Sequence, residues 1–561
     1  MPDKKETILL LENIADLLDF KGENKFKVGA YRFGAISIRR FEGDFEEAVK
    51  QKELDKIKGI GKSLQSIIYE YFEEGESSLY KQLKEEVPAG IEQLLVIKGL
   101  GARKINLLYD ELGISNINEL ETACRENRLA MLKGFGAATQ KKILTEIENQ
   151  KHHSKFVLLD TAEEFASEII SKLQTIAEVK KIEISGELRR GMEIISSIHI
   201  VLLINNKINF LKELKHKFEF QVSDWIILIK DYISIPINLH LTLSEDEFVK
   251  TLFITTGSDS FLAYLKVDPG KIKGRTEAEI FKSLKSSFVI PEMREAEYFT
   301  VKNKSLFNNS DLTEENFKGL LHFHTVYSDG RNTLDEMIDA AIKRRFRYAA
   351  VCDHSKTAIY ANGLSEERIL KEMEEIEQIS SFKKLYIFKG IESDILSDGS
   401  LDYSSDFMSN FQFVVASIHS QFSMDEDKMT QRILKAVENP FTDILGHPSG
   451  RLLLSRAPYK FNIKKIIDAC VTNGVAIEIN SNPRRLDLDW RWIYYAREKG
   501  CLFSINPDAH SIKEIDLIKY GVITGRKAGL RNSEVINCFS LAEFKNFLNR
   551  KVKRKFHKEI K

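Results

Sequence analysis

The spacing of apolar residues divides the chain into three stretches of different periodicity. From residue 1 to about 150, apolar residues recur every three or four positions and proline is scarce, which predicts a nearly all-helical region. Between 151 and about 300, runs such as KKIEISGELRR, SSIHIVLLINN and ISIPINLHLTL predict the strands of a mixed sheet, with helices between them. From 318 to about 555, apolar strands alternate regularly with amphipathic helices, which predicts a parallel sheet or barrel. We therefore expect a multidomain α and α/β protein.

A glycine pair recurs three times in the helical region, in KIKGIGKSLQSII, VIKGLGARKINLL and LKGFGAATQKKIL. Each pair follows a short apolar helix end and precedes another helix, which is the helix-hairpin-helix signature. Glycine allows a tight turn with positive φ, and the next helix N-terminus offers N–H groups to a phosphate. One copy could simply join two helices, but three copies with basic neighbours predict DNA binding without sequence specificity. The predicted DNA contacts are Gly59, Gly61, Lys62, Gly99, Gly101, Arg103, Lys104, Gly134 and Gly136.

Nine histidines and carboxylates stand at or just after the ends of the predicted C-terminal strands. The chain has 12 histidines, and six of them fall in these short signatures. An α/β barrel places its active site at this end of its strands, and residues two apart on a strand point to the same face. Three metal ions could share the set, which suits manganese, zinc or iron and the hydrolysis of phosphate esters. The predicted ligands are His322, His324, Asp329, His354, Glu392, His419, His447, Asp508 and His510, with Glu392, His419 and Asp508 as catalytic residues.

Two arginines follow the predicted ligand His447, in the run GRLLLSRAPY. Guanidinium groups clamp phosphates through paired hydrogen bonds. Arg451 and Arg456 are therefore candidates for phosphate binding, although a structural ion pair explains either one equally well.

The composition argues against several classes of protein. The formal net charge is zero, so contacts with DNA must come from local groups. The five cysteines are scattered without CxxC spacing, which favours a reducing compartment. The sequence contains neither a signal-peptide pattern nor an apolar run long enough to cross a bilayer. We expect a cytoplasmic protein that does not contact a membrane.

The runs HFHTVYSDG, CDH, GIESDILSDGSLDY, SIHS, GHPSGRLL and PDAHS resemble the motifs of the polymerase and histidinol phosphatase (PHP) domain. SGELRRG, IPEMRE and the glycine repeats resemble bacterial family X DNA polymerases fused to such a domain, so the resemblance covers almost the whole chain. It implies a distorted seven-stranded barrel with a three-metal, manganese-responsive site that supports 3′–5′ exonuclease activity. Carried over by motif, the first ion is held by His322, His324, Glu392 and Asp508, the second by Glu392, His419 and His447, and the third by Asp329, His354 and His510.

The same resemblance implies five segments. They are an N-terminal helical domain similar to the family's 8-kDa domain (1–80), a fingers-like helical domain (81–150), a polymerase palm and thumb (151–300), a linker (301–317) and the PHP domain (318–561).

The polymerase motifs depart from the family pattern where magnesium should bind. The family has three aspartates there, and this chain has two neutral polar residues and a histidine. Magnesium prefers anionic oxygen ligands, so we predict no magnesium in this region and no polymerase activity. The retained turn glycine and arginine pair could still hold a DNA end. The residues of this degenerate site are Ser197, His199, Asn238, Gly186, Arg189 and Arg190.

The resulting hypothesis is a DNA repair protein whose PHP domain hydrolyses DNA phosphodiesters at gaps or 3′ ends. Three alternatives stay open at this point. They are a phosphatase for small phosphate monoesters, a non-catalytic DNA-binding scaffold, and a polymerase that retains weak nucleotidyl transfer.

Overall fold

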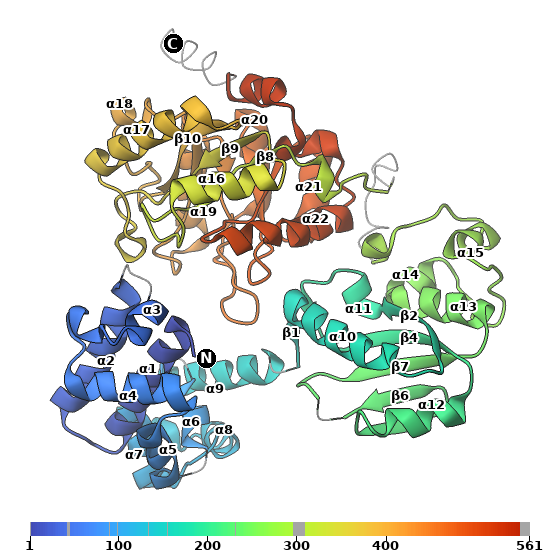
Figure 1. The fold of residues 1–561 in the computed structure, drawn as a ribbon, viewed down its shortest axis with the longest axis horizontal. Helices are drawn as coiled ribbons and strands as arrows, with labels where there is room; N and C mark the ends of the chain where they lie inside the picture. Colours follow the sequence, from blue (N-terminus) through green and yellow to red (C-terminus); the bar gives the residue numbers. More distant parts are fainter. Residues whose placement is uncertain are drawn as a thin grey trace. The chain divides into compact units, whose positions relative to one another are not determined.

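A computed structural model describes residues 2–41, 45–88, 90–97, 99–132, 134–153, 155–230, 232–295 and 309–549. The chain divides into two compact units, Met1–Ser154 and Lys155–Lys561 (Figure 1). Residues 301–308 of the predicted linker lie outside the described residues. Within the described ranges, no helix is both long enough and apolar enough to cross a membrane.

The described part of the first unit is helical, as the sequence predicts. One hydrophobic core runs from Leu10 to Ile147, and Phe20 packs edge-to-face on Tyr109 with ring centroids 6.1 Å apart. The predicted boundary near residue 80 therefore does not separate two cores, because α1 packs on helices from both sides of it. The elements are α1 (Lys4–Phe20), α2 (Lys25–Arg40), α3 (Phe45–Lys50), η1 (Leu54–Lys56), α4 (Lys62–Glu74), α5 (Ser78–Glu86), α6 (Ile91–Leu95), α7 (Ala102–Leu112), α8 (Ile117–Arg125), η2 (Leu129–Met131) and α9 (Ala137–His153).

The second unit begins with a mixed sheet, which we call the palm region (residues 155–295). Its strand order is β2-β4-β7-β6-β5, in which only β4 and β7 are parallel neighbours. Alternating burial along β7 shows that one face of the sheet is more exposed than the other. The elements are β1 (Val157–Leu158), α10 (Leu159–Gln174), β2 (Val179–Ser185), α11 (Gly186–Arg189), β3 (Ile194–Ile195), β4 (Ile198–Ile204), α12 (Lys207–Leu214), β5 (Phe220–Ser223), β6 (Ile226–Ile229), β7 (Ile237–Thr242), α13 (Glu245–Thr256), α14 (Asp259–Tyr264), α15 (Glu277–Ser283) and η3 (Pro291–Met293).

The barrel region (residues 309–549) is the predicted parallel β/α structure. Its strands run in chain order from β8 to β14, all parallel. A bridge between Phe323 and Ala509 brings the ends of the first and last strands together, and the N–H of His324 donates to the carbonyl of Ala509 at 2.8 Å. The strands are almost entirely buried and mostly apolar, as expected for a parallel sheet that is covered on both faces.

The strands and helices of the barrel region have the following bounds: η6 (Glu314–Asn316), β8 (Gly319–Leu320), α16 (Leu334–Lys343), β9 (Tyr348–Val351), η7 (Ile359–Ala361), α17 (Glu366–Phe382), β10 (Tyr386–Asp394), α18 (Ser405–Met408), β11 (Phe413–Ser417), α19 (Glu426–Val437), β12 (Ile444–Leu445), α20 (Ile463–Asn473), β13 (Ala476–Asn480), α21 (Trp490–Glu498), β14 (Phe503–Asn506), η8 (Ile512–Leu517), α22 (Ile518–Lys527), η9 (Asn532–Glu534) and η10 (Ile536–Cys538).

A buried group of charges joins the palm and barrel regions within the second unit. The ammonium of Lys527, on α22, lies 3.0 Å from a carboxylate oxygen of Glu295, and Arg190 lies 2.6 Å from the same oxygen. The indole N–H of Trp490 donates to Glu193 at 3.1 Å. Because a buried charge is costly unless it is paired, these contacts favour one arrangement of the two regions.

Candidate metal centre

The nine predicted ligands come together at one end of the barrel. They lie on the strand ends or on the segments that follow them, from β8, β9, β10, β11, β12 and β14. The carboxyl ends of parallel strands all meet at the same edge, so residues far apart in the chain converge there. Asp508 has φ +52°, a left-handed conformation that strains a non-glycine residue. Such strain is typical of functional sites.

Glu392, at the end of β10, lies at the centre of the cluster and is fully buried. Its Oε1 lies 3.0 Å from Nε2 of His447 and 3.3 Å from Nε2 of His419. Its Oε2 lies 2.9 Å from Nδ1 of His354. One carboxylate therefore faces ligands from several strands.

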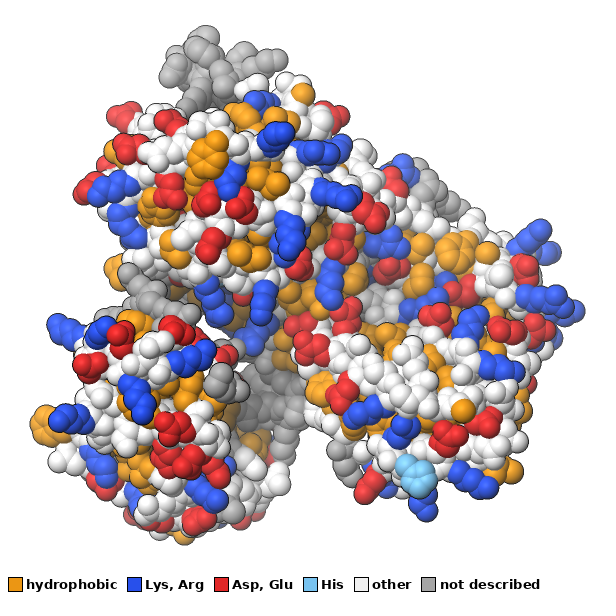
Figure 2. Space-filling view, in the orientation of Figure 1, with side chains coloured by type: hydrophobic (Ala, Val, Ile, Leu, Met, Phe, Trp, Pro, Cys, Tyr) orange, Lys and Arg blue, Asp and Glu red, His pale blue; other side chains and the backbone are white. Residues whose placement is uncertain are grey.

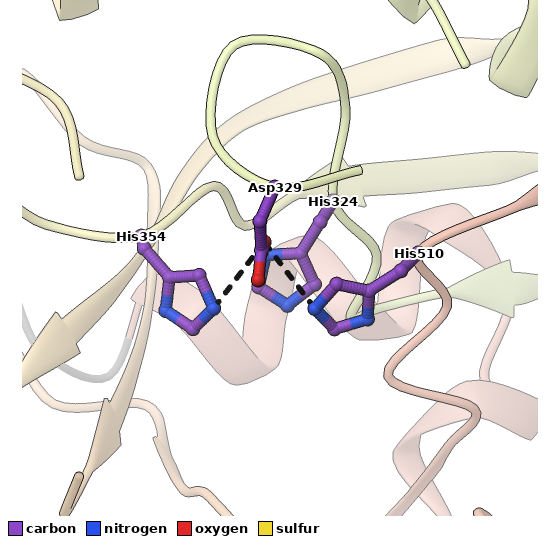
Figure 3. A group of neighbouring side chains, drawn as sticks. All are labelled: His324, Asp329, His354 and His510. Atoms are coloured by element: carbon purple, nitrogen blue, oxygen red, sulfur yellow. Dashed lines mark ion pairs between the residues drawn. The ribbon is translucent and has the colours of Figure 1, made fainter. Parts of the chain in front are cut away.

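Two further groups of side chains flank Glu392. Nε2 of His324 lies 3.0 Å from Oδ1 of Asp508, and Nε2 of His322 lies 3.5 Å from the same oxygen. Figure 3 shows the other group, in which the carboxylate of Asp329 lies between the rings of His354 and His510. Its Oδ1 lies 3.5 Å from Nε2 of His354 and 3.3 Å from Nε2 of His510.

Eight of the nine predicted ligands form three sets, in each of which the ligand atoms lie within 4.8 Å of one another. His447 belongs to none of these sets but lies 3.0 Å from Glu392. This grouping shares residues more widely than the motif resemblance implied. His324 and His354 each belong to two sets, because their rings lie between neighbouring groups and stack 4.4 Å apart. The assignment of ligands to individual ions stays a prediction. The sets are His322, His324 and Asp508; His354, Glu392 and His419; and His324, Asp329, His354 and His510.

The polar atoms of this cluster fit metal ions. Nε2 of His322, Nδ1 of His324 and Oε2 of Glu392 are buried without a hydrogen-bond partner among the described residues. A buried polar atom without a partner costs about 1–3 kcal/mol, and a cation bound there would remove that cost. Electrostatics agree: burial lowers the pKa of His510, but Asp329 and Asp508 outweigh it and raise that pKa to about 10. The carboxylates therefore favour positive charge here.

Two carboxylates that the sequence did not single out orient the ligands. Glu478, on β13, is fully buried and lies 2.6 Å from Nδ1 of His322. Asp394, at the end of β10, lies 2.6 Å from Nδ1 of His419. Histidine ligands commonly hold a carboxylate on their second nitrogen, which fixes the ring and its tautomer. A signal was present for Glu478, which is the charged residue of the strand AIEIN. It was absent for Asp394, because β10 also contains Lys389 and Glu392.

For Arg451, the structure favours the structural ion pair, which is one of the two interpretations left open by the sequence. Its guanidinium is buried, donates to the carbonyl of Arg485 at 2.8 Å and lies 2.6 Å from a carboxylate oxygen of Asp489. These contacts occupy its guanidinium, and phosphate binding by Arg451 stays a prediction. Arg456 has fewer contacts of this kind: its Nε donates to the carbonyl of Gly450 at 3.0 Å. Arg485 itself, which the sequence reasoning missed, has its Nε 4.0 Å from Oδ2 of Asp508.

The predicted degenerate polymerase site contains a hydrogen-bonded chain of Ser197, His199 and the neighbouring His240. Ser197 Oγ lies 2.9 Å from Nε2 of His199, and Nδ1 of His199 lies 2.9 Å from Nε2 of His240. His199 pairs with Asn238 across β4 and β7. Gly186 has φ +66°, and a Cβ there would lie 3.0 Å from the ring of His199. The turn is thus retained and packs directly on the altered residues.

The retained arginine pair forms ion pairs within the protein, and its contact with a DNA end stays a prediction. Arg189 donates to both carboxylate oxygens of Glu277, at 3.0 and 2.7 Å. Arg190 is buried and pairs with Glu295 at 2.6 Å. Both guanidiniums therefore act within the fold.

The three glycine turns have the predicted geometry. Gly59, Gly99 and Gly134 have φ values of +101°, +87° and +95°. Gly61 and Gly101 are the residues just before α4 and α7. A Cβ at Gly99 or Gly101 would meet nothing within 4 Å, and the same holds for Gly61, Gly134 and Gly136. A phosphate backbone can therefore approach these turns closely.

The basic residues near these turns are exposed or partly exposed. Lys62 is exposed, and Arg103 lies 3.2 Å from the carboxylate of Asp19 while its side chain stays largely exposed. Basic and acidic side chains are interspersed over the face drawn in Figure 2. On this face, attraction to a nucleic acid would therefore depend on local groups rather than on a surface of one sign.

Fold and site together define a protein that joins helix-hairpin-helix modules and a palm-like sheet to a metal-binding β/α barrel. Residues 2–77 match the helix-hairpin-helix domain, residues 91–149 the SAM-like helix-hairpin-helix tandem and residues 321–482 the PHP domain. PHP domains are metal-dependent. The chain is 32% identical to the DNA polymerase/3′–5′ exonuclease PolX of Bacillus subtilis (strain 168), over 98% of this chain and 99% of that protein. The chain therefore belongs to the PolX family, the bacterial family X DNA polymerases with a PHP domain.

Other relatives share a smaller part of the chain. A probable phosphatase of Thermoanaerobacter sp. (strain X514) is 27% identical over 42% of this chain and 95% of its own length. A probable phosphatase of Shewanella oneidensis is 27% identical over 29% of this chain and 61% of its own length. More than half of this chain thus has no counterpart in either match.

Proposed function

We propose that this protein binds DNA through its helix-hairpin-helix turns and hydrolyses phosphodiesters at 3′ ends in its barrel, as a 3′–5′ exonuclease. We further propose that its palm does not polymerise. The observation that carries the proposal is the contrast between the two candidate metal sites. The barrel brings eight of the predicted ligands into three sets and His447 next to Glu392, whereas the palm has Ser197, His199 and Asn238 where carboxylates would be needed.

The barrel supports hydrolysis because its candidate ligands are held in place by neighbouring carboxylates. Ions bound there, with manganese expected and zinc or iron also compatible, would lower the pKa of water and polarise the phosphoryl group. Glu478 and Asp394 hold the rings of His322 and His419 at 2.6 Å. Arg485, beside Asp508, and the partly exposed Arg456 are the basic groups that can neutralise a bound phosphate.

The helical unit favours DNA over a small phosphate monoester as the substrate. Its open glycine turns suit the backbone of a nucleic acid, which a free metabolite lacks. The phosphatases of similar sequence match only part of this chain. PolX of Bacillus subtilis is named a DNA polymerase/3′–5′ exonuclease and matches nearly all of it. We therefore infer that DNA with a free or gapped 3′ end is bound without sequence specificity.

The nuclease proposal is tested on 5′-labelled single-stranded and gapped DNA with Mn²⁺. We expect stepwise shortening from the 3′ end by the wild-type protein, and none by His324→Ala or Asp508→Ala. Asp443→Asn is a matched control, because Asp443 is a buried carboxylate at the start of β12, at the opposite end of the barrel. Absence of cleavage by the wild type refutes the proposal, and undiminished cleavage by both variants assigns the activity elsewhere.

Primer extension tests the palm. We expect no incorporation with Mg²⁺ or Mn²⁺, because serine, histidine and asparagine supply no negative charge for two ions. Extension that persists in Asp508→Ala would refute this part of the proposal, since the barrel site would then be disabled.

A further inference from the structure

An exposed aromatic ring stands at the rim of the metal centre. Tyr360 is 68% exposed, and its neighbour Ile359 on the same short turn, η7, is 86% exposed. We propose that Tyr360 is a base-stacking residue, whose ring receives the terminal nucleobase of the strand whose 3′ end enters the centre. This inference rests on the proposed function and names the part of the substrate that is recognised.

The position of the ring supports this role. Its centroid lies 6.1 Å from the ring of His354 and 6.1 Å from the ring of His419. These two histidines belong to one set of candidate ligands with Glu392. A group stacked on Tyr360 would therefore lie beside the place where a phosphate is held.

The turn that carries Tyr360 is fixed at both ends. The N–H of Thr357 donates to Asp402 at 2.7 Å, and its hydroxyl donates to Asp394 at 3.0 Å. After the turn, the amide of Asn362 donates to the carbonyl of Ser328 at 3.1 Å, which ties it to the segment that carries Asp329. The ring is thus presented in place before substrate arrives, which lowers the entropy cost of stacking.

The surroundings combine apolar and basic groups. Val326, on the segment before Asp329, is also about half exposed. Arg485 lies beside Asp508, and the guanidinium of Arg456 packs over the ring of Phe422 at 4.3 Å. Aromatic faces for bases together with cations for phosphates are the composition of a single-strand binding site. A small phosphate monoester needs only the cations.

The expected effect follows from the strength of base stacking. Stacking on an aromatic ring contributes substantially to the binding of a single strand, so Tyr360→Ala should lower kcat/KM on DNA about 10-fold or more, mainly through KM. Tyr360→Phe keeps the ring and should remain close to wild type. Phe382→Ala is the matched control: Phe382 is 66% exposed, and it ends α17 just before β10 begins, at the opposite end of the barrel.

The test removes the ring and the base separately. Cleavage is measured on two oligonucleotides, one ending in a normal 3′ nucleotide and one ending in an abasic 3′ residue. Tyr360→Ala should lose activity on the first and differ little from wild type on the second. An equal loss on both substrates, or a Tyr360→Phe variant as impaired as Tyr360→Ala, would overturn the proposal.

A binding measurement keeps this test separate from catalysis. An oligonucleotide with 2-aminopurine as its 3′ base is bound in EDTA, and quenching of the fluorescence reports stacking. We expect quenching with wild type and Tyr360→Phe and much less with Tyr360→Ala. Equal quenching by all three at saturation overturns the role of Tyr360, whereas absence of Mn²⁺-dependent cleavage by the wild type refutes the proposed function instead.

Discussion

Replacing Glu478 by glutamine should weaken metal binding without disrupting the barrel. The Glu478 carboxylate lies 2.6 Å from Nδ1 of His322, accepts the backbone N–H of His447 at 2.6 Å, and accepts the amide of Asn506 at 2.8 Å. Glutamine preserves the volume and one accepting oxygen but removes the charge. Alanine is less informative, because it would leave several buried donors without an acceptor and cost stability as well.

The magnitude follows from the bond to His322. A hydrogen bond to a charged group contributes about 1.5–3 kcal/mol and one between neutral groups about 0.5–1.5 kcal/mol. The difference of about 1.4 kcal/mol corresponds to a tenfold change in an equilibrium constant. We therefore expect the dissociation constant for Mn²⁺ at the His322 set to rise about 10-fold, within the range usual for carboxylates that orient metal-bound histidines.

Isothermal titration of metal-free protein with Mn²⁺ measures this directly, and the Mn²⁺ concentration for half-maximal DNA cleavage should shift by the same factor. Asp443→Asn again serves as the control, because it also neutralises a buried carboxylate, one that accepts the N–H of Val414 at 2.9 Å. Unchanged Mn²⁺ affinity in Glu478→Gln would refute the reasoning. An equal loss in Asp443→Asn would show a general effect of stability rather than orientation of His322.

Three further perturbations test the rest of the molecule. Burial, reinforced by His199, lowers the pKa of His240 from 6.5 to about 4. Between these two pH values His240 is therefore protonated in the unfolded state but neutral in the folded state. The unfolding free energy should drop by up to about 3 kcal/mol between pH 6.5 and 4, and denaturant titration should show a smaller drop for His240→Gln. Lys62→Ala together with Lys104→Ala would remove two of the proposed phosphate contacts and should reduce the slope of log Kd against log salt by about 2, measured by fluorescence anisotropy with duplex DNA. An unchanged slope would exclude these lysines. Lys527→Ala breaks a buried ion pair and should lower the unfolding free energy by about 3 kcal/mol, whereas an unchanged thermal midpoint would show that the pair is not stabilising.

The sequence by itself determined which residues meet at the barrel end. Parallel strands expose their carboxyl ends at one edge, so a histidine or carboxylate at each strand end is enough to predict the cluster. The glycine turns were also predictable, because positive φ is a local property of the chain. The departure from the family's aspartates was also predictable, because the identities of Ser197, His199 and Asn238 are given by the sequence itself.

Only the tertiary structure decided how each side chain is used. Glu478 and His322 lie 156 positions apart, and no local pattern predicts that one orients the other. Arg451 and Arg485 are the same residue type, and nothing local distinguishes their roles. In the fold, one carboxylate and two carbonyls hold Arg451, whereas Arg485 lies beside Asp508. Tyr360 is one of 17 tyrosines, and only its place at the rim distinguishes it. These roles depend on contacts between distant segments, and such contacts exist only once the chain has folded.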